Sequence, residues 1–274
     1  MNQTIAFIGA GNMATSLIGG LIANQYPASK IIACDIDADR LRQLQERFGI
    51  GTARDIVECA RAADVVMLAV KPQVMRDVCK PLAQTGAGAE PLFISIAAGV
   101  PIDAIDSWLG GGRSIVRCMP NTPALLQLGA TGLAANARVT VQQKVAAEQI
   151  LQAVGIGIWV EKEDDLDAVT AISGSGPAYF FYFIELLEAA GVKLGLEPQT
   201  AARLARQTAL GAANMAQDED VVELRAQVTS KKGTTEQAIL SFQRNQLSRL
   251  VEEATAAAQK RAQELARELT DDEV

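Results

Sequence analysis

The sequence predicts an α/β fold: an N-terminal domain with a mostly parallel sheet, followed by an all-helical domain. Over roughly the first 160 residues, short β-rich runs alternate with helical patterns, which implies right-handed βαβ units. After about residue 162 the strand pattern stops and only helical patterns remain. A change in composition near Glu161–Asp164 marks the boundary, so we expect domains over residues 1–162 and 163–274. A chain of 274 residues, 49% of them apolar, can bury a core in each.

The elements of the first domain follow from the spacing of apolar residues. The predicted strands are residues 4–8, 30–35, 64–70, 91–97, 114–118, 130–134 and 157–161. Between them, helical spacing covers residues 12–25, 38–48, 72–84, 102–109 and 140–154. Asp37 is the candidate N-cap of the second of these helices, and Asp103 lies in the first turn of the fourth.

The second domain is predicted to contain helices alone. They cover residues 164–174, 177–194, 198–217, 220–228 and 234–269, and Pro177 stands where a helix begins. The helix over Ala178–Ala190 holds five of the chain's twelve aromatic residues and is apolar on nearly every side. Such a helix must be buried. A domain of about 110 residues can hardly bury it alone, so we expect a partner subunit; the alternative is an ordinary central helix of a monomer.

Composition argues against several classes of partner. The net charge is −7 and no basic cluster is visible, which disfavours duplex DNA and anionic membranes as partners. The longest apolar stretch, Leu92–Pro101, is half as long as a membrane span. A strand-like run begins at Thr4 and the first basic residue after Met1 is Lys30, a pattern unlike a secretory signal.

The four cysteines predict a reducing environment. They are too widely spaced for a metal site or a CxxC redox pair, so we expect core thiols, no bound metal and a cytoplasmic protein; the residues are Cys34, Cys59, Cys79 and Cys118. Histidine is absent, which removes the commonest general acid–base residue. Hydride transfer fits such a chain, because a cofactor carries the difficult chemistry.

The first chemical motif is a glycine-rich turn between the first strand and the first helix. It has the GxGxxA form of the dinucleotide fingerprint of a Rossmann-type domain, Gly9-Ala10-Gly11-Asn12-Met13-Ala14. Gly9 permits the tight turn, Gly11 lets the backbone approach a pyrophosphate, and Ala14 lets the helix pack close to the strand. The phosphates would bind at the positive end of the helix. The alternative is a glycine turn that binds no ligand.

The end of the second strand bears on the choice of cofactor, which is NADPH or NADH. Asp35 lies about 25 residues after the fingerprint, where an acidic side chain accepts hydrogen bonds from the ribose hydroxyls and repels a 2′-phosphate. That favours NADH. Arg40 and Arg42 follow closely and are candidates to pair with a phosphate instead, so the choice stays open.

Two further loops complete the predicted cofactor site. They follow the third and fourth predicted strands, at carboxyl ends where an open parallel sheet binds ligands. Their small residues leave room for a nicotinamide ring, although Lys71 alone is also readily explained as a solvated lysine. The residues are Ala69, Val70, Lys71 and Pro72 in one loop, and Ile96, Ala97 and Ala98 in the other.

A polar segment in the second domain has the features of an anion site. A loop ends in Gly233-Thr234-Thr235 and a helix follows, with Thr234 and Gln237 at capping-box spacing. The free N–H groups of this helix start would bind a carboxylate. The Thr235 hydroxyl would lie beside that carboxylate as a donor. The alternative is a plain N-cap.

Several motifs together resemble the pyrroline-5-carboxylate reductase family. They occur in that family's order over nearly the whole chain: IGAGNMA (8–14), AVKP (69–72), IAAGV (96–100), RCMPNTPA (117–124), SGSGPAY (173–179) and VTSKKGTTEQAI (228–239). The resemblance implies reduction of pyrroline-5-carboxylate to L-proline by hydride transfer from NAD(P)H, the last step of proline biosynthesis. It also implies a homodimer or a higher oligomer of dimers, in which a partner's helical domain closes each site.

The resemblance also assigns roles in the late segment. It matches Thr235 to the family's threonine that hydrogen-bonds the imine nitrogen, and Gly233 and Thr234 to backbone contacts with the substrate carboxylate, in a substrate loop that includes Ser230. This chain departs from the family at Lys231 and Lys232, where the loop usually reads Ser-Pro-Gly-Gly. Asp55 stands near the usual position of an asparagine that contacts the cofactor ribose.

Two other functions compete with this interpretation. A β-hydroxyacid dehydrogenase shares the two-domain plan but commonly has a lysine in the first long helix after the nucleotide domain. Here no lysine occurs over residues 164–192, and Lys193 follows the SGSGPAY segment. A non-catalytic nucleotide sensor would bind the cofactor without turnover, which the Gly233-Thr234-Thr235 segment disfavours.

Overall fold

The computed structural model describes residues 3–85 and 91–271, which pack as two compact units. One unit runs up to Ser175 and also includes the residues from Ala258 on, and the other is Gly176–Ala257. Packing thus groups residues 163–175 and the end of the last helix with the sheet, where the sequence pattern had placed them with the helices. The division by role into residues 1–162 and 163–274 remains a prediction.

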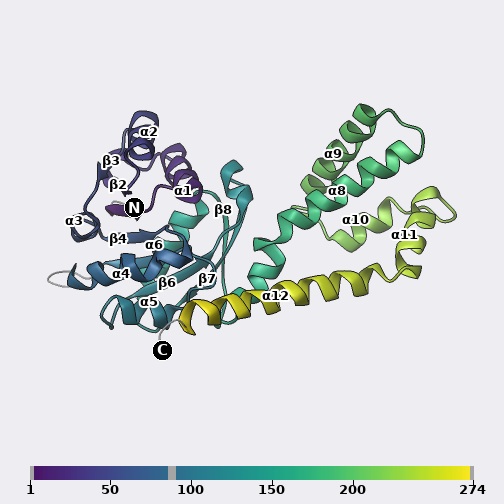
Figure 1. Cartoon of the computed structure of the whole chain (residues 1–274). Coiled ribbons are helices and arrows are strands. Elements are labelled where there is room, and N and C mark those ends of the chain that lie inside the picture. Colours follow the sequence, from purple (N-terminus) through teal and green to yellow (C-terminus); the bar gives the residue numbers. More distant parts are fainter. Residues whose placement is uncertain (1–2, 86–90, 272–274) are drawn as a thin grey trace. The chain divides into compact units, whose positions relative to one another are not determined.

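The first unit is built on a sheet with the strand order β3-β2-β1-β4-β5-β6-β7-β8 (Figure 1). Neighbouring strands are parallel except β6 and β7, which are antiparallel. The strands are β1 (Ile5–Ile8), β2 (Ile31–Cys34), β3 (Gly51–Ala53), β4 (Val65–Leu68), β5 (Leu92–Ser95), β6 (Ile115–Met119), β7 (Gly129–Ala135) and β8 (Gly155–Trp159). The predicted parallel-sheet domain is confirmed.

Helices cover both faces of this sheet. They are α1 (Asn12–Ala23), α2 (Ala38–Phe48), α3 (Ile56–Arg61), α4 (Met75–Leu82), α5 (Ile102–Trp108), α6 (Val141–Gln152) and α7 (Asp165–Val169). Alternate residues of β1 illustrate the layering: Phe7 packs in a core with α1, α2 and α6, whereas Ile8 packs in a second core with α3, α4 and α5. Because both faces are buried, the strands are continuously apolar rather than alternating.

Most element boundaries agree with the sequence prediction, with two omissions in this unit. β3 and α3 were not predicted, because three residues, Gly51–Ala53, show no apolar run and α3 is less than two turns long. The predicted helix 72–84 is divided into a 3₁₀ turn, α4 and a second 3₁₀ turn. The short 3₁₀ segments are Ala28–Lys30, Pro72–Val74, Ala83–Thr85 and Thr122–Leu126, and a π-helical turn spans Thr170–Gly174.

Helix starts and buried thiols also follow the prediction. The Asp37 carboxylate accepts from the backbone N–H groups of Asp39 and Arg40 and caps α2. Asp103 lies in the first turn of α5. All four cysteines are buried and unpaired. Burial raises the pKa of Cys79 to about 12.

The second unit is helical, and α12 continues from it into the unit with the sheet. Its helices are α8 (Gly176–Lys193), α9 (Pro198–Met215), α10 (Val221–Gln227), α11 (Thr234–Arg244) and the start of α12 (Leu247–Asp271). The predicted single helix over 234–269 is wrong. It breaks where Gln246 adopts a left-handed conformation with φ 56°, a conformation that ends helices. The sequence carries no glycine there to signal the break.

Helix α8 exposes its aromatic residues within the single chain. Phe180 is 73% exposed and Phe181 66%, and Tyr182 and Phe183 are also exposed. The helix packs beside α9 (Figure 1). The Phe183 ring lies 6.3 Å from that of Phe242 on α11. An apolar patch of this kind marks a surface that another molecule covers. Among the described residues, no helix is long and apolar enough to cross a membrane.

Candidate cofactor site and substrate loop

Three loops meet at one edge of the sheet because their strands are neighbours. β1, β4 and β5 are adjacent and parallel, so the residues that follow them leave the sheet side by side. Backbone hydrogen bonds continue the pairing beyond the strands: the Ala69 N–H donates to Ile8 O at 2.8 Å and the Ile96 N–H donates to Leu68 O at 3.2 Å. The fingerprint, the loop 69–72 and the loop 96–98 therefore lie together, as predicted.

Gly9 is required by the protein's own packing. Its φ is 103°, and a Cβ at this position would lie 2.6 Å from the carbonyl oxygen of Ala69. Its N–H donates to Cys34 O at 2.8 Å, which ties the turn to β2. A side chain at Gly9 would therefore push β1 and β4 apart.

Gly11 is different, because nothing in the described chain requires a glycine there. Its φ of −72° and ψ of −177° are open to any residue, and an added Cβ would meet no atom within 4 Å. It caps α1 without any side-chain hydrogen bond, and no partner within the described chain is found for the N–H groups of Asn12 and Met13. Free donors beside an open backbone form a site for phosphate.

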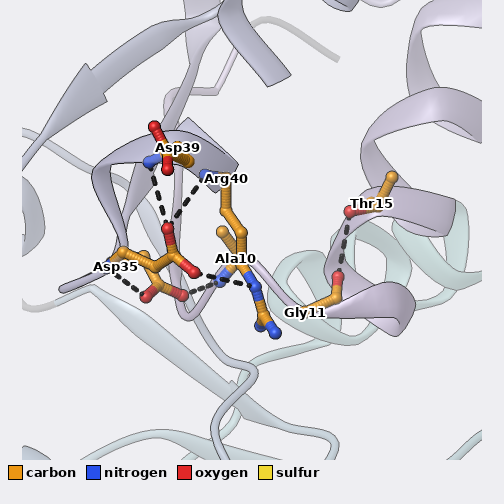
Figure 2. A network of polar contacts seen from close by, with 7 residues as sticks. Ala10, Gly11, Thr15, Asp35, Asp39 and Arg40 are labelled. Atoms are coloured by element: carbon orange, nitrogen blue, oxygen red, sulfur yellow. Dashed lines mark hydrogen bonds and ion pairs between the residues drawn. The ribbon is translucent and has the colours of Figure 1, made fainter. Parts of the chain in front are cut away.

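Asp35 lies directly against the fingerprint. Figure 2 shows its carboxylate beside Ala10: Oδ2 accepts from the Ala10 N–H at 2.6 Å, and Oδ1 accepts from the Asp37 N–H at 2.9 Å. A carboxylate oxygen has a second lone pair, so both oxygens keep the capacity to accept from ribose hydroxyls. The Thr15 hydroxyl donates to Gly11 O at 3.0 Å and secures the start of α1 (Figure 2).

The remaining predicted cofactor residues are placed at the same edge, with different exposures. Lys71 precedes the 3₁₀ turn that begins at Pro72, and its side chain is exposed. Ala97 is buried at 3% and Ala98 is exposed. Asp55, by contrast, caps α3: its carboxylate accepts from the backbone N–H groups of Val57 and Glu58.

The sequence interpretation missed two features near this edge. Ile36, between Asp35 and Asp37, is fully exposed at 101%, the highest value among the exposed large apolar side chains that the structure describes. An apolar residue between two acidic ones was the available signal.

A buried ion pair is the second missed feature. Arg117, 7% exposed, donates from Nη1 to Glu163 Oε1 at 2.8 Å, and the same oxygen accepts from the Ile102 N–H at 2.8 Å. It thereby anchors α5, which follows the loop 96–98. No local pattern links residues so far apart in the chain.

The predicted substrate loop lies in the second unit and forms a tight turn. The Gly233 N–H donates to Ser230 O at 2.9 Å, and Lys232, the third residue of the turn, has a φ of 61°. A positive φ at the third position alone is the pattern of a type II turn, which favours proline second and glycine third. Lys231 and Lys232 keep the turn that the family's Pro-Gly would form. A Cβ at Gly233 would overlap the Ser230 hydroxyl.

The predicted N-cap at Thr234 is wrong. Gly233 is the N-cap of α11, it makes no side-chain cap bond, and Thr234 is the first helical residue. The capping box with Gln237 is therefore absent. Instead the Glu236 carboxylate accepts from the Lys232 N–H at 2.7 Å. The side chain that contacts the backbone before the helix is therefore Glu236, and not Gln237 as predicted.

Thr235, the second residue of α11, has a hydroxyl with no hydrogen-bond partner among the described residues. The hydroxyls of Thr229 and Thr255, in contrast, donate to the carbonyl oxygens four residues earlier, Arg225 O and Val251 O. Nor does the described chain offer a partner to the N–H groups of residues 234–236. A free hydroxyl thus lies beside free helix N–H groups.

Replacing Lys232 with glycine is expected to stabilise the protein. A side chain in the left-handed region costs roughly 1–2 kcal/mol, part of which the greater freedom of glycine in the unfolded chain offsets. We expect the free energy of unfolding to rise by about 0.5–1 kcal/mol in urea titrations. Lys231→Gly is the matched control, because Lys231 does not have a positive φ, and this change should lower the free energy of unfolding. Equal effects of the two substitutions would contradict the turn assignment.

Comparison with known proteins identifies the family. Residues 163–265 match the family model for pyrroline-5-carboxylate reductase dimerisation, and residues 4–99 match the model for NADP oxidoreductase, coenzyme F420-dependent. A pyrroline-5-carboxylate reductase of Pseudomonas aeruginosa is 53% identical over 97% of each chain. The chain belongs to the pyrroline-5-carboxylate reductase family.

Solved structures of the family share the whole fold. A pyrroline-5-carboxylate reductase from Coxiella burnetii superposes with a TM-score of 0.94 at 46% identity, covering 97% of this chain and 99% of that one. A Plasmodium falciparum pyrroline carboxylate reductase with NADP bound has a TM-score of 0.82 at 29% identity, covering 97% and 98%.

Membership decides the reaction and the class of enzyme. The chain is an NAD(P)H-dependent oxidoreductase that reduces pyrroline-5-carboxylate to proline, the last step of proline biosynthesis. This confirms the predicted family, fold class and cofactor class. It argues against the hydroxyacid dehydrogenase and sensor alternatives, and the matched dimerisation region indicates a homo-oligomer.

Proposed function

We propose that Thr235 is the residue that acts on the substrate imine in this reduction. The observation that supports this most directly is its free hydroxyl, which lies beside the free N–H groups at the start of α11. The free N–H groups of Thr234 and Thr235 would bind the substrate carboxylate, next to Gly233, whose own N–H donates to Ser230 O in the preceding turn. The hydroxyl then donates to the imine nitrogen and polarises the C=N bond.

The residues present at the sheet edge fit a nicotinamide dinucleotide. Gly11 leaves open the space that a side chain would fill, and the free N–H groups of Asn12 and Met13 would hold the pyrophosphate. We assign the adenosine end to Asp35, and the nicotinamide end to the loops 69–72 and 96–98. The bound cofactor supplies the hydride that the imine carbon accepts.

The reaction does not need a strong protein acid. A protonated imine is already electrophilic, and towards that form the Thr235 hydroxyl would accept from the nitrogen N–H, whereas it donates to the neutral imine; the chain contains no histidine. We therefore assign most of the acceleration to positioning and to the exclusion of water. Thr235 contributes by orienting the nitrogen and by stabilising the change of charge on it.

We infer that the oligomer is an obligate dimer, or an assembly of such dimers, built through the helices of residues 164–217, which include α8 and α9. In it, the substrate loop of one subunit would complete the cofactor site of another. The exposed aromatic face of α8 supports this, because obligate interfaces resemble a core cut in half. The division of roles at residue 162 belongs to the same proposal: residues 1–162 would bind the cofactor and 163–274 would dimerise and bind substrate.

Replacing Phe181 with aspartate is expected to dissociate the dimer. A charge buried without a partner in an apolar interface costs several kcal/mol, which lowers association more than about a hundredfold. Sedimentation at low micromolar concentration should show monomer for Phe181→Asp, and dimer or larger species for wild type and for the control Phe181→Leu. A stable wild-type monomer would contradict the proposal.

We also propose a cytoplasmic location, which the four buried, unpaired thiols support. A steady-state assay tests the function as a whole. Oxidation of NADH or NADPH should depend on added pyrroline-5-carboxylate and yield proline. Cofactor binding without turnover would indicate a sensor, and turnover only with hydroxyacids would indicate a dehydrogenase of the other class.

A further inference from the structure

We propose that Asp37 controls whether the enzyme accepts NADPH, by holding Arg40 in an ion pair that the cofactor's 2′-phosphate must replace. The proposal rests on the cofactor site described above and concerns the choice between its two cofactors. The turn from β2 into α2 carries the relevant groups, and Figure 2 shows how they lie against the fingerprint.

The Asp37 carboxylate makes two kinds of contact at once. Its Oδ1 accepts from the backbone N–H groups of Asp39 at 3.0 Å and Arg40 at 3.2 Å, which caps α2. Its Oδ2 lies 3.3 Å from Nε of Arg40. One carboxylate therefore starts the helix and also fixes the Arg40 side chain.

Arg40 is held in this way only through Nε. Its guanidinium group points towards the turn at Ala10 and Gly11 (Figure 2), and no hydrogen bond or ion pair to its Nη atoms is found within the described chain. The two side chains are 56% and 45% exposed, and ion pairs in solvent are weak. A 2′-phosphate is a stronger partner for a guanidinium group, because two parallel hydrogen bonds to its oxygens become available.

The rest of the turn opposes a phosphate. Asp35 directs its carboxylate at Ala10, and Arg42 is paired with Asp39 at 2.8 Å, in an ion pair that is exposed like that of Arg40. The Arg40 guanidinium group is the cationic group that Figure 2 shows beside Ala10 and Gly11. While Asp37 neutralises it, the turn presents the unbalanced charge of Asp35, which favours the uncharged ribose of NADH.

An exposed apolar side chain at the same turn is available to a ligand. Ile36, between Asp35 and Asp37, is 101% exposed. A planar base packed against Ile36 would bury it. The adenosine of a dinucleotide carries such a base next to the ribose whose 2′ position distinguishes the two cofactors.

Asp35 is a poorer candidate than Asp37 for the residue that discriminates between NADPH and NADH. Both of its oxygens accept backbone N–H groups, so Asp35→Ser removes supports of the fingerprint itself. We expect that change to weaken both cofactors, which differs from the simple shift towards NADPH that its charge alone would predict. Asp37→Asn removes the charge while asparagine remains an equally good N-cap.

The test compares kcat/KM for NADPH and NADH, with dissociation constants measured on the same proteins by cofactor fluorescence. In Asp37→Asn the NADPH/NADH ratio should rise about tenfold, the effect of one charge-assisted hydrogen bond. In Asp37→Asn with Arg40→Ala the ratio should return to the wild-type value. Asp39→Asn, which removes the same charge from the same turn, is the matched control and should leave the ratio within about twofold.

Three outcomes would overturn the proposal. They are an unchanged ratio in Asp37→Asn, an equal rise in Asp39→Asn, and a rise that persists without Arg40. Asp37→Ser, which also caps helices, repeats the test if the asparagine variant unfolds. The dissociation constants decide the question even if no turnover is detected, so failure of the proposed reaction is distinguishable from failure of this proposal.

Discussion

Replacing Gly11 with valine is expected to abolish cofactor binding and leave the fold intact. The backbone at Gly11 has an extended conformation that valine adopts readily, and the space around an added Cβ is open. The side chain would occupy the place where the pyrophosphate approaches the free N–H groups of α1. We expect binding to weaken by at least about a hundredfold, since phosphate contacts at a helix start would be lost together.

Gly9→Ala is the informative comparison, because it changes the same motif but is expected to destabilise the fold instead of blocking the cofactor. The added methyl group would lie 2.6 Å from Ala69 O, at a φ of 103° that alanine avoids. The backbone strain alone costs roughly 1–3 kcal/mol. Gly9→Ala should therefore lower the melting temperature, and Gly11→Val should not. Fluorescence titration with NADPH and NADH, beside thermal melts, checks both; normal binding by Gly11→Val would mean that the fingerprint is a turn without a ligand.

Replacing Thr235 with alanine is expected to lower kcat/KM by roughly ten- to a hundredfold. A hydrogen bond to a charged or polarised group contributes about 1.5–3 kcal/mol, and this one is proposed to act where charge on the imine nitrogen is changing. The hydroxyl makes no hydrogen bond within the described chain and Gly233 is the N-cap, so folding should be almost unaffected. Thr235→Ser keeps the hydroxyl and should keep most of the activity.

Thr234→Ala provides the matched control in the adjacent helical position. Because Thr234 is not the N-cap, its loss should change neither the melting temperature nor kcat/KM by much. Near-normal kcat/KM in Thr235→Ala would remove Thr235 from the mechanism and leave water or the substrate's own iminium proton as the donor. An equal loss in Thr234→Ala would assign the effect to the helix start as a whole.

Local pattern was sufficient for much of this protein. The fingerprint, the strands that precede each loop and the order of the motifs are all short-range features, because strand and helix formation depend on nearby residues. The family's motifs then predicted the reaction. Short elements were missed where the pattern is too brief to read: β3 has three residues, and the break at Gln246 lacks a glycine.

In the substrate loop, two neighbouring residues, Gly233 and Thr234, compete to be the N-cap of α11. Thr234 has the spacing of a capping residue, but Gly233 adopts the extended cap conformation and Glu236 supplies the reciprocal contact to Lys232. Several arrangements of a helix start differ little in free energy, so residue type alone does not decide between them. No side chain of the described chain then caps the start of α11, and its first N–H groups stay free for the proposed substrate.

The sequence by itself determined the fold class, the motifs and the kind of chemistry, since each depends on residues close together in the chain. Only the tertiary structure distinguished the two glycines of the motif, because Ala69, just after β4, makes Gly9 indispensable, while no described atom lies within 4 Å of a Cβ added at Gly11. Only the tertiary structure brought Asp35 to Ala10 and Arg117 to Glu163. Such contacts depend on the order of strands in the sheet, and that order is set by the packing of the whole domain.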